Sequence, residues 1–147
     1  MIYLADTNVL LRFAFRTHPL HAVVRRAVRQ LKTGGHRFHA TPQNCAEFWN
    51  VATRPPANNG FGCTPVAAVR YLRLIERVFP VLLDEASTYA EWRRLVVNFG
   101  VSGIQVHDAR LAAVMLVHGI THILTFNTAD FTRYAPLGMV AVDPTTV

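Results

Sequence analysis

Two patterns of apolar residues alternate along the chain. Short apolar runs, which are typical of strands buried on both faces, occupy residues 2–5, 37–40, 80–83, 121–126 and 139–142. Between them, apolar residues recur at helical spacing over residues 8–15, 19–32, 42–53, 65–79, 86–99 and 102–119. Strands that alternate with helices predict an α/β fold of three layers, α/β/α, with a parallel sheet of five strands in the middle.

Several helix boundaries are visible in the sequence. Thr41 and Thr64 each precede a proline, a pair that favours a helix start because threonine caps the first turn and proline fits its first position. Ser102 with Gln105 has the spacing of a capping box. Residues 57–63 are rich in Asn and Gly and predict a loop.

Length and cysteine content favour one domain in a reducing compartment. We expect the 147 residues to form a single domain, 1–147, large enough for a substantial core. Cys45 and Cys63 form no metal-ligand or disulfide pattern, which indicates the cytoplasm. The longest aliphatic stretch, residues 111–117, is too short to span a membrane, so we expect no membrane partner.

The net charge of +6 favours a polyanionic partner. Apart from Lys32 the cations are all arginine, whose guanidinium group can bind phosphate through two hydrogen bonds. Nucleic acid is one candidate partner, although solvated helix faces also account for such a composition. The arginines near the predicted loop and on the following helix suit RNA phosphates or the acidic segment of a partner protein: Arg54, Arg70, Arg73 and Arg77.

Four of the nine acidic residues stand where chemistry is expected. Asp6 and Asp130 each follow an apolar run, Asp108 begins a helix, and Glu47 lies within one. Taken singly, each has an ordinary explanation as a helix cap, a helix-start acid or a solvated residue. Taken together, they can meet at one edge of a doubly wound sheet, where such folds bind ligands.

A shared acidic site implies a particular chemistry. Two carboxylates 4 Å apart repel by roughly 4 kcal/mol at an effective dielectric constant near 20, so a cluster requires protons or a divalent cation. Oxygen ligands favour Mg²⁺ or Mn²⁺. Such an ion can activate water and polarise a phosphoryl oxygen, which indicates phosphodiester hydrolysis.

The segments that carry the four acids, residues 2–10, 42–50, 107–113 and 124–131, resemble the PIN-domain nucleases in order and separation. The resemblance spans nearly the whole chain. It implies a PIN-like fold and an Mg²⁺- or Mn²⁺-dependent ribonuclease acting on RNA. It also implies the toxin of a type II toxin-antitoxin pair, with a cognate antitoxin protein as partner and a homodimer as the assembly.

Carried over position by position, the resemblance makes Asp6, Glu47, Asp108 and Asp130 the metal-binding and catalytic acids. Thr7, Asn8, Thr125 and Asn127 become supporting polar residues. Asn127 stands where some family members have a further acid, so the resemblance implies a weaker second metal position. No catalytic role is assigned to His107, and Trp49 and Trp92 are expected in the core.

Other classes of protein are alternatives to this one. A PIN-like module that binds RNA or acts as a scaffold without catalysis is the main alternative, and metal binding discriminates the two. A haloacid-dehalogenase-like phosphatase requires a second Asp where Asn8 stands. A receiver domain requires a positioned lysine, whereas Lys32 lies on the polar face of a predicted helix.

Overall fold

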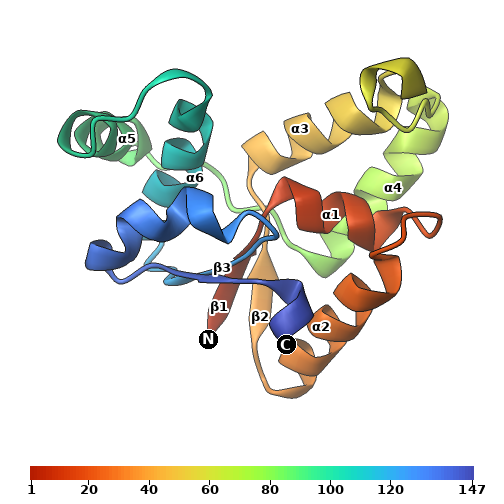
Figure 1. Ribbon diagram of the computed structural model, residues 1–147, viewed down its shortest axis with the longest axis horizontal. Helices are drawn as coiled ribbons and strands as arrows, with labels where there is room; N and C mark the ends of the chain where they lie inside the picture. Colours follow the sequence, from red (N-terminus) through yellow and green to blue (C-terminus); the bar gives the residue numbers. More distant parts are fainter.

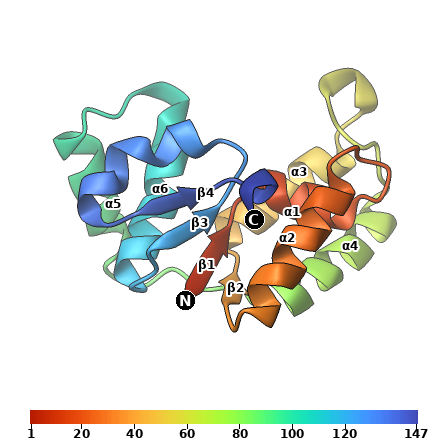
Figure 2. The same cartoon turned by 60° about the horizontal axis from the view of Figure 1, so that its bottom comes forward.

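The computed structural model describes residues 1–147 and has a parallel sheet at its centre (Figures 1 and 2). Its four strands lie in the order β2-β1-β3-β4. They are β1 (Ile2–Ala5), β2 (Arg37–His39), β3 (His122–Leu124) and β4 (Val140–Val142). The predicted α/β fold with a parallel sheet is confirmed, whereas the predicted number of five strands is wrong.

The missing fifth strand is reduced to one bridge. Residues 80–83 make a single parallel bridge, between Val81 and Ala40. Two backbone hydrogen bonds form it, from Ala40 N to Pro80 O at 3.2 Å and from Leu82 N to Ala40 O at 2.9 Å. Because Pro80 has no N–H group and the partner segment ends where a helix begins at Pro42, the ladder cannot extend. The strands predicted over 37–40, 121–126 and 139–142 are present but shorter.

Helices cover both faces of the sheet (Figure 1). One layer contains α1 (Thr7–Ala14), α2 (His21–Thr33), α3 (Pro42–Thr53) and α4 (Pro65–Val78). The other contains α5 (Thr88–Asn98) and α6 (Val106–Val117). Short 3₁₀ segments complete the chain: η1 (Pro56–Asn58), η2 (Gly103–Gln105), η3 (Thr128–Leu137) and η4 (Pro144–Thr146). None of the helices combines the length and the apolar character that a bilayer crossing requires.

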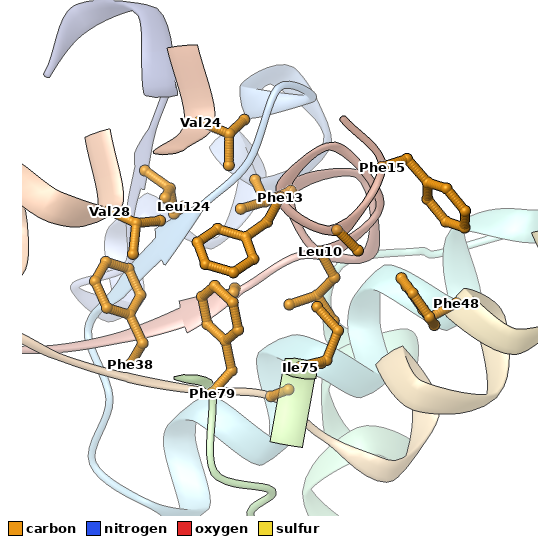
Figure 3. Packing of buried hydrophobic residues seen from close by; sticks show 14 of the residues in the cluster. Leu10, Phe13, Phe15, Val24, Val28, Phe38, Phe48, Ile75, Phe79 and Leu124 are labelled. Atoms are coloured by element: carbon orange, nitrogen blue, oxygen red, sulfur yellow. The ribbon is translucent and has the colours of Figure 1, made fainter. Parts of the chain in front are cut away.

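Alternating strand residues feed two separate cores. Tyr3 and Ala5 pack with α1 to α4, whereas Leu4 packs with α5, α6 and η3. Successive side chains of a strand point to opposite faces, so a strand that is apolar at every position is buried on both. Figure 3 shows the first core, where the rings of Phe13 and Phe79 meet edge to face at 5.1 Å. Both cores hold the strand ends in fixed positions.

Helix starts follow the sequence at most positions. The Thr41 side chain accepts a hydrogen bond from Asn44 N, and the Asn44 side chain accepts one from Thr41 N, which completes a capping box. Thr64 caps α4 in the predicted way. The capping box predicted for Ser102 is wrong, because its side chain makes no capping hydrogen bond. Gly103 adopts φ 60°, a left-handed conformation that delays the α-helix until Val106.

Candidate active site

The site lies where the sheet changes winding direction. From β1 the chain runs to β2 on one side of β1 and returns later to β3 on the other side. The carboxyl ends of β1 and β3 therefore open a crevice, the usual ligand position in such sheets. Asp6 follows β1 and Thr125 follows β3, and Thr125 Oγ1 donates a hydrogen bond to Asp6 Oδ2 at 2.7 Å.

Three of the four predicted acids line one cleft of about 510 Å³ above this crevice. Glu47 reaches it from α3, Asp108 from α6 and Asp130 from η3. Asp6 lies behind the cleft wall, with only 7% of its surface exposed, and adjoins Thr7, which lines the cleft. We call this space the acidic cleft; its other lining residues are Asn50, Val51, Arg54, Ile104 and His107.

The Asp6 carboxylate is held by three hydrogen bonds. Thr7 N donates to Oδ1 at 2.7 Å, while Asn8 Nδ2 and Thr125 Oγ1 donate to Oδ2 at 3.1 and 2.7 Å. The first of these bonds makes Asp6 the N-cap of α1. The structure therefore places Thr7, Asn8 and Thr125, all predicted as supporting residues, around one predicted acid.

Glu47 is not a fully solvated residue on the outer face of its helix. It is half-buried, and its two oxygens accept hydrogen bonds from Thr7 Oγ1 at 2.7 Å and Gln43 Nε2 at 2.9 Å. The buried Asn44 donates from Nδ2 to Thr7 Oγ1 at 3.1 Å, so Thr7 connects α1 with α3. Sequence reasoning missed Gln43 and Asn44. The signals were the spacing of four residues from Gln43 to Glu47 and the place of Asn44 three residues after Thr41.

Asp108 and Asp130 have no protein hydrogen-bond donor at their carboxylates. Asp108 is half-buried and Asp130 is exposed. Burial first, and then the negative charges of Asp130, Asp6 and Glu47, raise the pKa of Asp108 to about 6 against the opposing effect of His107. Burial also raises the pKa of Asp6, although its hydrogen bonds to Thr125 and Thr7 oppose that shift. The acids therefore act on one another electrostatically.

The remaining predicted residues lie at the margin. The Asn127 side chain is exposed and makes no hydrogen bond. Its backbone contacts the site, with N donating to Thr125 Oγ1 at 3.0 Å and O accepting from Asp130 N at 3.1 Å. His107 is exposed and lines the acidic cleft. Its carbonyl oxygen accepts a hydrogen bond from Gln43 Nε2 at 3.0 Å, which connects α6 to α3.

The residues present suit a divalent cation, although they do not form a closed ligand cage. No three His, Cys, Asp or Glu side chains converge closely enough to hold a metal ion as they stand. The donor set is nevertheless composed of carboxylate oxygens, the ligands that Mg²⁺ and Mn²⁺ prefer. The Asp108 and Asp130 oxygens are free of protein donors, and no Lys or Arg forms an ion pair with any of the four acids. A divalent cation would relieve their mutual repulsion.

Comparison with known proteins identifies the family of the chain. A family model described as "PIN domain" matches residues 3–136, so the chain belongs to the PIN domain family. The family predicted from the four acidic segments is thereby confirmed. No match was found among curated proteins.

Solved structures share the fold at low sequence identity. VapBC-1 from nontypeable Haemophilus influenzae is 17% identical over 99% of both chains, with a TM-score of 0.72. VapC20 from Mycobacterium tuberculosis, described as a sarcin-ricin loop cleaving toxin, is 19% identical over 97% of this chain and 98% of the other, with a TM-score of 0.68. FitAcB from Neisseria gonorrhoeae is 21% identical over the whole of both chains, with a TM-score of 0.65.

Proposed function

We propose that the chain is a metal-dependent endoribonuclease that hydrolyses RNA phosphodiester bonds and serves as the toxin of a toxin-antitoxin pair. One observation carries the proposal: four carboxylates from separate parts of the chain meet around one cleft without a cationic partner. Membership of the PIN domain family supports a nuclease. The proposal takes residues 1–147 as one nuclease domain.

In this proposal Asp6, Glu47, Asp108 and Asp130 hold Mg²⁺ or Mn²⁺. When bound there, such an ion would polarise a phosphoryl oxygen of the RNA and lower the pKa of a bound water. Thr7, Asn8 and Thr125 fix the direction of the Asp6 oxygens, so that carboxylate needs little reorganisation during the reaction. The carboxylates at the open side, Asp108 and Asp130, accept hydrogen bonds from the attacking water and orient it.

RNA and an antitoxin are proposed as partners on two grounds. The net charge of +6 attracts a polyanion, although the acidic cleft itself is negative. VapC20, similar in fold, is described as a toxin that cleaves the sarcin-ricin loop, and other similar structures are named VapBC-1 and FitAcB. We also propose a homodimer, for which sedimentation should give twice the monomer mass of 16.5 kDa.

The central test compares wild type with Asp6→Asn in Mn²⁺ or Mg²⁺ buffer. The asparagine oxygen can still accept the hydrogen bond from Thr7 N, so α1 keeps its cap. Its NH2 group replaces the oxygen that accepts from Thr125 and Asn8, and the site loses a charge. We expect wild type to cleave structured RNA, EDTA to stop it, and Asp6→Asn to cleave roughly 1,000-fold more slowly. Glu76→Gln, which removes an exposed acid from α4, is the matched control and should cleave normally. Equal cleavage by Asp6→Asn would reject the proposed site.

The alternative is a PIN-like RNA-binding or scaffold module without catalysis. The open arrangement of the carboxylates, no three of which converge on one point, favours it. Titration calorimetry with Mn²⁺ separates the two functions. The nuclease should bind the ion with an affinity that falls in Asp6→Asn, whereas the module should give no heat of binding in either protein.

A further inference from the structure

Two half-buried arginines beside the acidic cleft form no ion pair. They are Arg12 on α1 and Arg54 at the end of α3, and the Nε atom of each is buried without a hydrogen-bond acceptor. The two ion pairs of the protein involve other residues. Withdrawing a cation from water without an anion costs free energy, so such groups suggest an anionic ligand.

Arg54 stands at the edge of the acidic cleft and is the only Lys or Arg that lines it. Its Nη2 donates to Asn59 O at 3.2 Å, and its own carbonyl accepts a hydrogen bond from Gly62 N at 2.9 Å. Gly60 packs so closely that a Cβ atom there would lie 1.9 Å from Arg54 O. The loop after α3 therefore fixes the backbone of Arg54 in one position.

A second pocket, of about 390 Å³, lies on the other side of Val51, which lines both spaces. We call it the flanking pocket. Arg12, His18, Asn59 and Phe61 line it, and no carboxylate does. Its volume falls in the range of roughly 300–1,000 Å³ that is usual for small-ligand sites. The sign of the local charge thus changes from negative to positive across Val51.

The donors in the flanking pocket are fixed by the protein. Arg12 Nη1 donates to Asn8 O at 2.9 Å, and its guanidinium group lies 4.6 Å from the centre of the Phe126 ring. His18 Nδ1 accepts a hydrogen bond from Leu20 N at 3.0 Å, so the neutral ring carries its proton on Nε2. Burial, with the charge of Arg12 as a second cause, lowers the pKa of His18 and favours that neutral form.

We propose that the flanking pocket is a second RNA subsite, in which Arg12 binds the phosphate of a nucleotide next to the one that is cleaved. Arg54 binds the phosphate between this subsite and the acids. Continuity with the acidic cleft favours one RNA strand that crosses Val51. The inference rests on the proposed nuclease, and it adds a binding site for the substrate beyond the four acids and their supporting residues.

The test places one neutral methylphosphonate at a time in an RNA stem-loop that wild type cleaves. In wild type, neutralising one phosphate beside the cleavage position should raise KM about 10-fold and change kcat little, because one charged hydrogen bond is lost. Arg12→Gln should raise the KM of the unmodified RNA by a similar factor. In this variant the methylphosphonate at that position should cause no further rise of KM. Arg93→Gln removes an equal charge from the exposed face of α5. Its KM for the unmodified RNA and the rise of KM with each methylphosphonate should equal those of wild type.

Separate variants test the proposed contact between Arg54 and an RNA phosphate. Arg54→Gln should lose its response at the phosphate nearer the cleavage position. Gly60→Ala keeps the net charge but displaces the Arg54 backbone, so it should raise KM as well. Arg12→Lys should restore part of the affinity, because lysine keeps the charge without the two-pronged geometry. Unfolding midpoints of all variants show whether each is folded.

Each other outcome overturns the subsite. If Arg12→Gln keeps the wild-type KM and the wild-type response to every methylphosphonate, the pocket does not bind RNA. If the same variant instead loses affinity for a glutamate-rich peptide, a protein carboxylate is the ligand. If wild type cleaves no RNA with either metal, the nuclease and the subsite fail together. Active wild type with an unresponsive Arg12 rejects the subsite alone.

Discussion

Charges of one sign gather in two regions of the molecule, and they are held differently. In the acidic cleft, Asp6 and Glu47 accept hydrogen bonds from neighbouring side chains, and Asp6 is buried. A second region, the basic groove between α2, α4 and β2, contains Arg25, Arg29, Lys32, Arg37 and Arg77.

The cations of the basic groove are exposed and none forms an ion pair. Water screens their repulsion, whereas burial intensifies that of the acids. The acidic cleft therefore costs stability in the absence of metal, and the basic groove costs little. Three variants test this difference.

Thr7→Val should have the largest effect on stability. Valine keeps the shape but removes the hydroxyl group that joins Glu47 to Asn44. The Asn44 amide is fully buried and would lose a hydrogen-bond partner, so we expect a loss of about 2 kcal/mol in urea unfolding. Thr33→Val, at an exposed position beside the basic groove, should change stability far less. Equal losses would mean that the Thr7 contacts contribute nothing.

Asp108→Asn should stabilise the metal-free protein while reducing cleavage. The folded-state pKa of Asp108, about 6, lies above its usual value of 3.8. Protonation of Asp108 therefore stabilises the folded state of wild type relative to the unfolded state. This contribution is complete below about pH 3.8 and is lost as pH rises through about 6.

The variant should accordingly be more stable than wild type by about 1 kcal/mol at pH 8, after allowance for solvent screening, and equal to it near pH 3.5. Thermal unfolding in EDTA at both pH values measures the difference. A variant less stable than wild type at pH 8 would contradict the repulsion described for the cleft. Excess Mg²⁺ should reduce the difference in stability between the variant and wild type. Wild type is expected to bind the ion more tightly, and binding stabilises the native state.

The double substitution Lys32→Gln and Arg77→Gln should have the smallest effect. Both side chains are exposed, and the only hydrogen bond between them and the protein joins Lys32 Nζ to Val78 O at 3.3 Å. We expect the free energy of unfolding to change by less than about 0.5 kcal/mol. Cleavage of a short RNA should be unchanged, because the groove does not adjoin the acids. A tenfold slower cleavage would extend the RNA path to this groove.

Sequence patterns predicted the features that depend on local residue order. Continuous apolar runs predicted strands buried on both faces, and Thr41 and Thr64 predicted helix starts. The positions of Asp6 and Asp130 after apolar runs indicated the edge of the sheet where the cleft lies. These features depend on periodicity and capping, which are properties of short segments.

Features that depend on distant neighbours were missed. Residues 80–83 have the composition of a strand. The number of residues that can pair with the neighbouring chain segment depends on where that segment, after β2, ends. The late start of α6 at Val106 depends on the left-handed conformation of Gly103, which the Ser102 and Gln105 spacing does not reveal. Arg54 was named from the sequence as a candidate for RNA phosphates, but Arg12 was not, because the pocket that it lines forms only when folding brings it beside Val51 and Asn59.

The contact between Thr125 and Asp6 joins positions 119 residues apart, and this separation has a consequence during translation. Ribosomes release roughly 5–20 residues per second, so β1 and α1 emerge many seconds before β3 and η3. Until Asp130 has left the exit tunnel, a nascent chain lacks one of the carboxylates that line the acidic cleft. The cleft is thus completed only at a late stage of synthesis.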